Sequence, residues 1–109
     1  MNGDNGWPFP RAKATIYETG THVPLAIRWP ERVAPGRVVK DFVSLSDLAP
    51  TYLEACGLEP LQQMTGRSLM NTLAGNGEGW VDPERDHVLT AMETHVDCRD
   101  VGEGMRGGY

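Results

Sequence analysis

The sequence has few cysteines, no long apolar run and no basic cluster, and each absence narrows its function. Cys56 and Cys98 are widely spaced and form no CxxC pair, so neither a zinc site nor a redox motif is indicated. Two unpaired thiols are favoured over a disulfide. No apolar run reaches the roughly 18–20 residues of a membrane span. The ten basic residues are scattered through a chain of net charge −5, which argues against nucleic acid or an anionic membrane as the main partner.

The N-terminal residues lack the basic start and apolar core of a signal peptide. The chain also has no GxGxxG, P-loop, HExxH or GxSxG motif, and no internal repeat. What is present is the composition of a soluble globular protein, with 39% hydrophobic and 23% charged residues in a length of 109. That length is one domain or a part of one. The 13 glycines and eight prolines predict a loop-rich fold of short elements.

Local patterns predict an α/β chain, with the sheet type left open. Ser46 is the candidate N-cap of the clearest helix, and Gly57 is its typical C′ residue. Apolar residues recur between them at helical spacing and include Cys56, which we expect on the buried face. The other expected elements are loop over 1–21 with at most a helical turn near Ala12–Tyr17, a buried strand over 23–29, an extended piece over 38–43, a short helix over 67–74 and a strand over 87–92.

Asp4 and Asn5 form the most informative pair of side chains. Adjacent carboxylate and amide oxygens suit a hard cation such as Ca²⁺. A Pro-rich turn then leads to Lys13, whose ammonium group would hold an oxyanion against that metal. Taken alone, Asp-Asn-Gly is more often a bare turn, and a single lysine is more often solvated surface. Glu93 and His95 follow a predicted strand, a place where binding residues often lie, although solvated surface is again the commoner role.

Several motifs occur in the order found in sulfatases. Asp4-Asn5-Gly6 is followed by Lys13, and then come the segments Tyr17-Glu18-Thr19-Gly20, Val23-Pro24-Leu25-Ala26-Ile27-Arg28-Trp29, Ser44-Leu45-Ser46-Asp47-Leu48-Ala49-Pro50-Thr51 and Gly66-Arg67-Ser68-Leu69. The Pro8-Phe9-Pro10 insertion is similar to the N-sulfoglucosamine sulfohydrolase-like branch. The match covers most of residues 4–75 and continues more loosely to the end. The chain therefore closely resembles the sulfatase family.

The resemblance implies hydrolysis of sulfate esters or N-sulfates of sugars at a calcium site. Asp4 and Asn5 would be metal ligands, Lys13 would bind a sulfate oxygen as a catalytic and substrate-binding residue, and Glu93 and His95 would face the sugar. The implied fold is an alkaline-phosphatase-like α/β sandwich, with a central mixed sheet flanked by helices. Export to the periplasm, the cell exterior or the lysosome is typical of the family, although the chain itself shows no targeting signal.

The chain departs from the family pattern at the nucleophile. Sulfatases use a formylglycine made from a Cys/Ser-x-Pro-x-Arg segment, and neither Cys56 nor Cys98 lies in one. The Asp-Asp calcium ligands and the apolar strand expected before Asp4 are also absent. We therefore expect residues 1–109 to be the later part of a sulfatase catalytic domain, without its nucleophile-bearing part and inactive alone. An isolated slice of this kind would expose strand edges, which favours self-association.

Three alternatives remain open at this stage. A phosphomonoester or phosphonate-monoester hydrolase of the same superfamily would differ in its nucleophile segment, which is not in this chain. A non-catalytic binding module on the same scaffold would have no nucleophile segment at all. A decayed homologue would keep the motifs without the activity.

Overall fold

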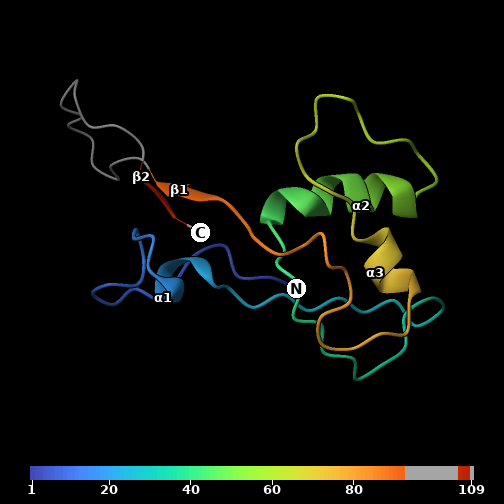
Figure 1. The fold of residues 1–109 in the computed structure, drawn as a ribbon, viewed down its shortest axis with the longest axis horizontal. Coiled ribbons are helices and arrows are strands. Elements are labelled where there is room, and N and C mark those ends of the chain that lie inside the picture. The colour runs from blue at the N-terminus through green and yellow to red at the C-terminus, as the bar shows by residue number, and fades with distance from the viewer. Residues whose placement is uncertain (93–105, 109) are drawn as a thin grey trace. The chain divides into compact units, whose positions relative to one another are not determined.

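The computed structural model describes residues 1–92 and 106–108, and their short elements occur in the order α1, α2, α3, β1, β2 (Figure 1). The helices are α1 at Glu18–Thr21, α2 at Leu48–Ala55 and α3 at Met70–Ala74. The strands are β1 at Thr90–Met92 and β2 at Arg106–Gly108. The chain divides into two compact units: Met1–Ile27 with Leu89–Tyr109, and Arg28–Val88. No helix of the described residues is long and apolar enough to cross a bilayer.

Strand content is small within the described ranges. β1 and β2 pair antiparallel, with Ala91 opposite Gly107. Two isolated bridges add to this pair, Asn2 with Leu25 (antiparallel) and Val39 with Gly79 (parallel). Of the expected α/β class, the described residues show helices and one two-stranded sheet. The central mixed sheet flanked by helices stays a prediction for the complete domain.

The buried strand predicted over 23–29 is wrong. This segment makes a single bridge, in which Gly3 N–H donates to the Pro24 carbonyl at 2.9 Å and Ala26 N–H donates to the Met1 carbonyl at 2.8 Å. Ile27 is 38% exposed, so the apolar run is not buried among the described residues. Pro24 has no N–H to donate to a second neighbour, which limits the segment to one-sided pairing.

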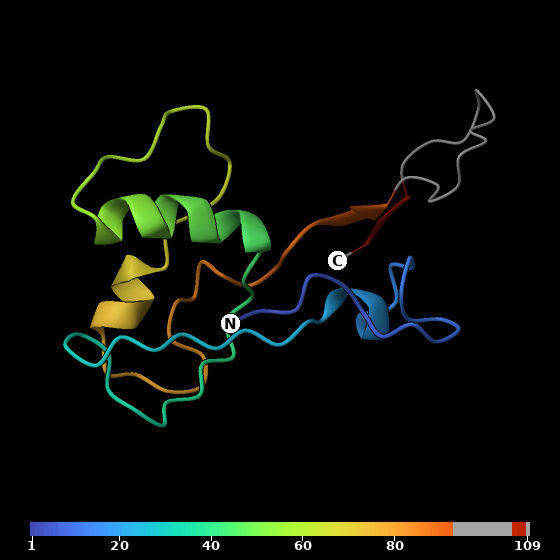
Figure 2. The same cartoon turned by 180° about the vertical axis from the view of Figure 1, so that it is seen from behind.

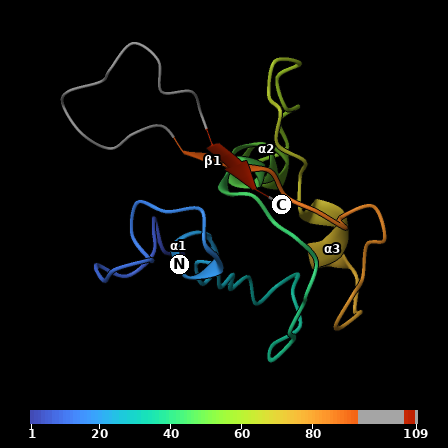
Figure 3. The ribbon, with the colours of Figure 1, turned by 60° about the vertical axis from the view of Figure 1, so that its left-hand side comes forward.

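The helical turn expected near Ala12–Tyr17 is displaced, because the helix there is α1 at Glu18–Thr21. Residues 10–17 form turns instead. Two of them, Arg11 and Ala14, have φ of 63° and 59° and therefore cannot continue a right-handed helix. In the unit that contains them, α1 lies beside the N-terminal segment (Figure 3), and Gly6 N–H donates to the Gly20 carbonyl at 3.2 Å.

The main helix, α2, is confirmed, but its start differs from the prediction. Ser44 rather than Ser46 is the N-cap, and a 3₁₀ turn at Leu45–Asp47 leads directly into α2. The Ser44 hydroxyl accepts from Ser46 N–H, and the Asp47 carboxylate accepts from Ser44 N–H at 3.1 Å. This reciprocal pair is a capping box. Ser46 lies inside the turn, where its hydroxyl donates to that of Ser44.

The end of α2 follows the prediction at Gly57. Its φ of +76° suits glycine, Gly57 N–H donates to the Glu54 carbonyl, and Leu58 N–H donates to the Leu53 carbonyl. These two bonds form a Schellman motif. Cys56, however, is exposed, so the prediction that it lies in the core is wrong. The buried residues of α2 are Pro50 and Thr51 instead.

Within residues 28–88, α3 packs beside α2, and the loop that follows α2 projects on the side away from α3 (Figures 1 and 2). Arg37 connects this packing to the segment after α3. Its guanidinium donates to the carbonyls of Thr72 at 2.9 Å and Gly77 at 2.8 Å. The predicted extended piece over 38–43 contributes only the bridge at Val39.

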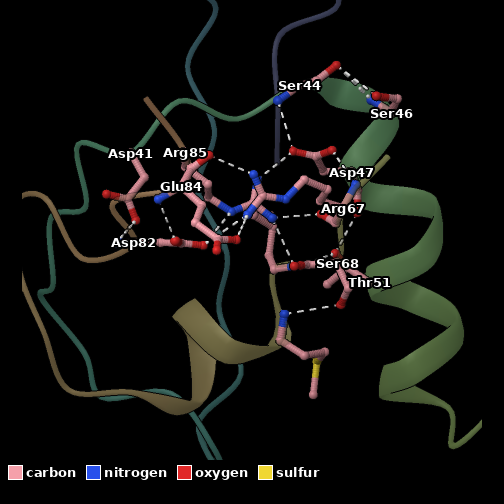
Figure 4. Close-up of polar contacts among 12 residues, drawn as sticks. Asp41, Ser44, Ser46, Asp47, Thr51, Arg67, Ser68, Asp82, Glu84 and Arg85 are labelled. Atoms are coloured by element: carbon pink, nitrogen blue, oxygen red, sulfur yellow. Dashed lines mark hydrogen bonds and ion pairs between the residues drawn. The ribbon is translucent and has the colours of Figure 1, made fainter. Parts of the chain in front are cut away.

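A buried ion pair forms the polar centre of the same unit. Arg85 Nη1 lies 2.8 Å from Asp47 Oδ2, and both side chains are less than a tenth exposed (Figure 4). Arg85 Nη2 donates to the carbonyls of Arg67 and Ser68, Arg85 Nε lies 3.5 Å from Asp82 Oδ2, and Arg67 N–H donates to Asp47 Oδ1. Buried charges of this kind are tolerated because every donor and acceptor has a partner. The Ser-x-x-Asp-Leu-Ala-Pro-Thr and Gly-Arg-Ser-Leu motifs therefore meet at this pair.

Candidate functional site

The Asp4-Asn5 pair lies on backbone that is held on both sides. Gly3 N–H donates to the Pro24 carbonyl before the pair, and Gly6 N–H donates to the Gly20 carbonyl after it. Gly6 is buried, and a Cβ there would clash with the Thr19 carbonyl and lie 2.6 Å from Gly20 Cα. Only glycine allows this approach. The backbone of the pair is thus fixed by hydrogen bonds on both sides and is not a free N-terminal tail.

The side chains of Asp4 and Asn5 are exposed, and neither makes a hydrogen bond or ion pair within the described ranges. Their oxygens are therefore free to bind a cation, and carboxylate and amide oxygens are the donors that Ca²⁺ accepts. The pair fits part of such a site. A complete calcium site needs about six to eight oxygens, and residues 1–92 and 106–108 contain no cluster of three or more His, Cys, Asp or Glu that could hold a metal.

A closed loop follows the pair, and hydrogen bonds bring its end at Lys13 back to Trp7. The Trp7 carbonyl accepts from Phe9 N–H at 2.8 Å and from Lys13 N–H at 2.9 Å, and Ala12 N–H donates to the Phe9 carbonyl at 3.1 Å. We call residues 6–13 the DNG loop. The Lys13 side chain is exposed and has no partner among the described residues, so its ammonium group is free to bind an anion.

Two strained residues lie at the end of this loop. Arg11 and Ala14 have left-handed φ values, which cost of order 1–3 kcal/mol for each non-glycine residue. Arg11 is held there because Thr19 Oγ1 donates to its carbonyl at 2.6 Å. The surrounding contacts thus maintain an unfavourable backbone on both sides of Lys13, a feature that clusters at functional sites.

Of the five predicted site residues, Asp4, Asn5 and Lys13 are exposed on adjoining stretches of backbone, and no contact joins their side chains within the described part of the chain. Glu93 and His95 lie outside the described residues. Among the described residues, the one clear pKa shift is elsewhere: a hydrogen bond with His87 lowers the pKa of the exposed Asp86 carboxyl.

Sequence reasoning missed the Asp47–Arg85 pair. Asp47 is part of the Ser-x-x-Asp motif in the sequence, and Arg85 lies in the polar stretch Asp82-Pro83-Glu84-Arg85-Asp86, which carries no motif. The pair is structural rather than catalytic, because its charged atoms are already satisfied by each other and by main-chain groups. The available signal was that two of the segments that meet at the pair carry motifs of the same family, at 44–51 and 66–69.

Comparison with known proteins finds sulfatases among the relatives of this chain. A family model described as the C-terminal part of N-sulphoglucosamine sulphohydrolase matches residues 3–94. An ulvan-active sulfatase of Formosa agariphila is 30% identical over 104 residues, which is 95% of this chain and 16% of that protein. Arylsulfatase K of Xenopus laevis is 41% identical over 71 residues, which is 65% of this chain and 13% of that protein.

The N-sulphoglucosamine sulphohydrolase of Homo sapiens is 36% identical over 83 residues, which is 67% of this chain and 16% of that protein. The chain therefore spans about a sixth or less of the length of these relatives. No solved structure matches it. The family match covers the DNG loop, the capping box of α2 and the Asp47–Arg85 pair together. The chain belongs to the sulfatases, as a C-terminal portion of the N-sulphoglucosamine sulphohydrolase type.

Proposed function

We propose that this chain is the part of a calcium-dependent sulfatase that supplies two metal ligands and a sulfate-binding lysine. Family membership supports hydrolysis of a sulfate group as the reaction class. The observation that carries the assignment to residues is the closure of the DNG loop. The 2.9 Å hydrogen bond from Lys13 N–H to the Trp7 carbonyl holds the main chain of Lys13 next to that of Trp7, two residues after Asn5.

Asp4 and Asn5 would hold the cation with their side-chain oxygens, together with ligands from the rest of the protein. When bound, a calcium ion supplies Lewis-acid polarisation of the sulfate oxygens. Lys13 would donate a charge-assisted hydrogen bond to a sulfate oxygen and stabilise the charge that develops on the transferring group. The formylglycine nucleophile would come from the part of the protein that this chain does not contain. We therefore expect the 109 residues to be inactive alone.

The substrate class proposed here is a sulfated sugar, carrying either a sulfate ester or an N-sulfate. The family match to the N-sulphoglucosamine type supports it. Glu93 and His95 are proposed to face the sugar. The ulvan-active relative has a differently described target, so the sugar and its linkage are best identified by assay of the full-length protein against a panel of sulfated saccharides.

The first test is a peptide map of the protein as its native source makes it. We expect peptides that precede Met1 and include a formylglycine derived from cysteine or serine. An upstream serine or threonine nucleophile without that modification would favour a phosphomonoester hydrolase. A native chain without a nucleophile segment would contradict the enzyme proposal and favour a binding module.

The second test addresses Lys13 directly. In the full-length protein, Lys13→Ala should lower kcat for 4-nitrophenyl sulfate by roughly 100- to 1000-fold, as loss of one charge-stabilising donor typically does. Lys40→Ala is the matched control, because Lys40 is also exposed but lies in the unit of residues 28–88 and bonds Gly79 only through its main chain. Equal activity of the two variants would remove Lys13 from the site.

A further inference from the structure

Two aromatic rings project from the DNG loop between the Asp4-Asn5 pair and Lys13. Trp7 is 72% exposed and Phe9 is 62% exposed. Their ring centroids lie 6.4 Å apart, with the planes tilted by 45°. Exposed apolar side chains that lie side by side are a feature of binding surfaces. The position of this pair, beside the proposed sulfate site, calls for a specific explanation.

The backbone that carries the rings is preorganised. The Trp7 carbonyl accepts both Phe9 N–H and Lys13 N–H, and Ala12 N–H closes onto the Phe9 carbonyl. Pro8 and Pro10 flank Phe9 and fix their own φ angles. Little conformational freedom of the backbone remains to be lost when a ligand lies on the rings. Such preorganisation favours binding.

The electrostatics around the rings favour an anion. The stretch between Asp4 and Glu18 carries two positive charges, Arg11 and Lys13, and no negative charge, in a chain whose net charge is −5. Arg11 is exposed, and its left-handed backbone is fixed by the hydrogen bond from Thr19 Oγ1 to its carbonyl. A guanidinium is the side chain best suited to pair with a carboxylate or sulfate.

A second exposed aromatic pair lies in the unit of residues 28–88. Phe42 and Trp80 have ring centroids 5.7 Å apart and planes tilted by 41°, and Trp80 is 64% exposed. Both signs of charge adjoin this pair in sequence, with Lys40 as well as Asp41, Glu78 and Asp82, and Asp82 pairs with Arg67 and Arg85. The two pairs thus share ring types and exposure, and Phe42 and Trp80 provide an internal comparison.

We propose that Trp7 and Phe9 form a stacking platform for a pyranose ring of the anionic, sulfated carbohydrate, with Arg11 pairing to an anionic group of that sugar. This inference rests on the proposed function and names residues that select its substrate. The apolar C–H face of a pyranose packs on an aromatic ring, while the charged substituents at its rim reach Arg11 and Lys13. Platform residues of this kind bind the substrate and do not take part in bond cleavage.

The test compares two substrates of the full-length protein, a sulfated disaccharide and a simple alkyl sulfate that has no ring. Trp7→Ala and Phe9→Ala should each raise KM for the disaccharide by about 10- to 100-fold, which corresponds to loss of a buried aromatic contact. Hydrolysis of the alkyl sulfate should not change. Trp7→Phe and Phe9→Tyr keep a ring and should restore most of the affinity. Trp80→Ala is the matched control and should leave both substrates unaffected.

Loss of activity in Trp7→Ala and Phe9→Ala that is equal for both substrates, with a lower melting temperature, would overturn the proposal and identify the rings as a packing surface. Unchanged KM for the disaccharide would also overturn it. Lys13→Ala separates this inference from the proposed function. If Lys13→Ala fails to slow alkyl sulfate hydrolysis, the site assignment itself is wrong. If it slows hydrolysis while Trp7→Ala shows no selectivity, only the platform is wrong.

Discussion

At the residue scale, the most consequential interaction is the ion pair of Asp47 and Arg85. Both side chains are almost fully buried, and Asp47 also accepts main-chain N–H groups from Ser44 and Arg67. Arg85 Nε also lies 3.5 Å from the partly exposed Asp82 Oδ2, so removal of Asp47 leaves Arg85 with only this longer contact, and removal of Arg85 leaves Asp47 without its cationic partner. That imbalance is far more costly than loss of an exposed pair such as Glu18 and His22, whose side chains are 85% and 77% exposed.

We predict that Asp47→Ala lowers the free energy of unfolding by about 3–5 kcal/mol. Arg85→Ala should cost a similar amount, and the double variant should cost clearly less than the sum, because no lone charge remains. Urea denaturation followed by circular dichroism measures all three. His22→Ala is the control and should stay within about 0.5 kcal/mol. Strict additivity of the two single variants would show that the residues do not stabilise the fold as a pair.

At the element scale, the ends of α2 explain why this short helix forms. Ser44 and Asp47 cap its start reciprocally, and Gly57 closes its end in a Schellman motif. These contacts satisfy main-chain groups that would otherwise lack partners. The buried face of α2 is anchored by a polar side chain, since Thr51 Oγ1 donates to the Asp47 carbonyl and accepts from Leu69 N–H at 2.9 Å.

Two glycines that follow helices offer a matched comparison. Gly57 has φ of +76°, whereas Gly75, after α3, has φ of −75°. Gly57→Ala should destabilise the chain by about 1–2 kcal/mol, because an L-residue is strained in the left-handed region. Gly75→Ala should be neutral or stabilising by up to about 1 kcal/mol, since alanine adopts its φ readily and the nearest atom to a new Cβ lies at 3.5 Å. Thermal melts of both variants test this, and equal effects would contradict it.

At the scale of the whole molecule, calcium should act as a ligand of the complete protein. Asp4 and Asn5 can supply only part of the six to eight oxygens that Ca²⁺ takes, so the remaining ligands must come from other parts of a sulfatase. We predict that chelation by EGTA abolishes sulfatase activity of the full-length protein and lowers its melting temperature, and that Ca²⁺ restores both. Asp4→Ala should weaken the calcium response, with Asp86→Ala as the exposed control. Full activity in EGTA would exclude the calcium site.

The small β-sheet also bears on the behaviour of the whole chain. β1 and β2 pair only with each other in the described ranges, and Leu89, next to β1, is 78% exposed. Unpaired edges and apolar side chains promote association. We predict that the isolated 109-residue chain dimerises or aggregates, as measured by size-exclusion chromatography with light scattering. A monomeric elution profile at high concentration would refute this.

Part of the structure followed from local sequence alone. The helix over residues 48–55 and its glycine end were predictable, because caps, spacing and left-handed glycine act between neighbouring residues. The order of the motifs identified the sulfatase family before any coordinates, and the Asp4-Asn5 pair with Lys13 was named as the site from the same order.

Other features depended on contacts between distant residues. The apolar run at 23–29 has the composition of a buried strand, yet within the described ranges only residues 1–3 pair with it, since a strand needs partners that composition does not supply. Cys56 has the spacing of a core residue but is exposed, because it is the C-cap that follows α2, whose buried residues are Pro50 and Thr51. Arg85 gave no signal in the sequence. Its burial was decided by tertiary structure, which placed Asp47 and two main-chain carbonyls around one guanidinium.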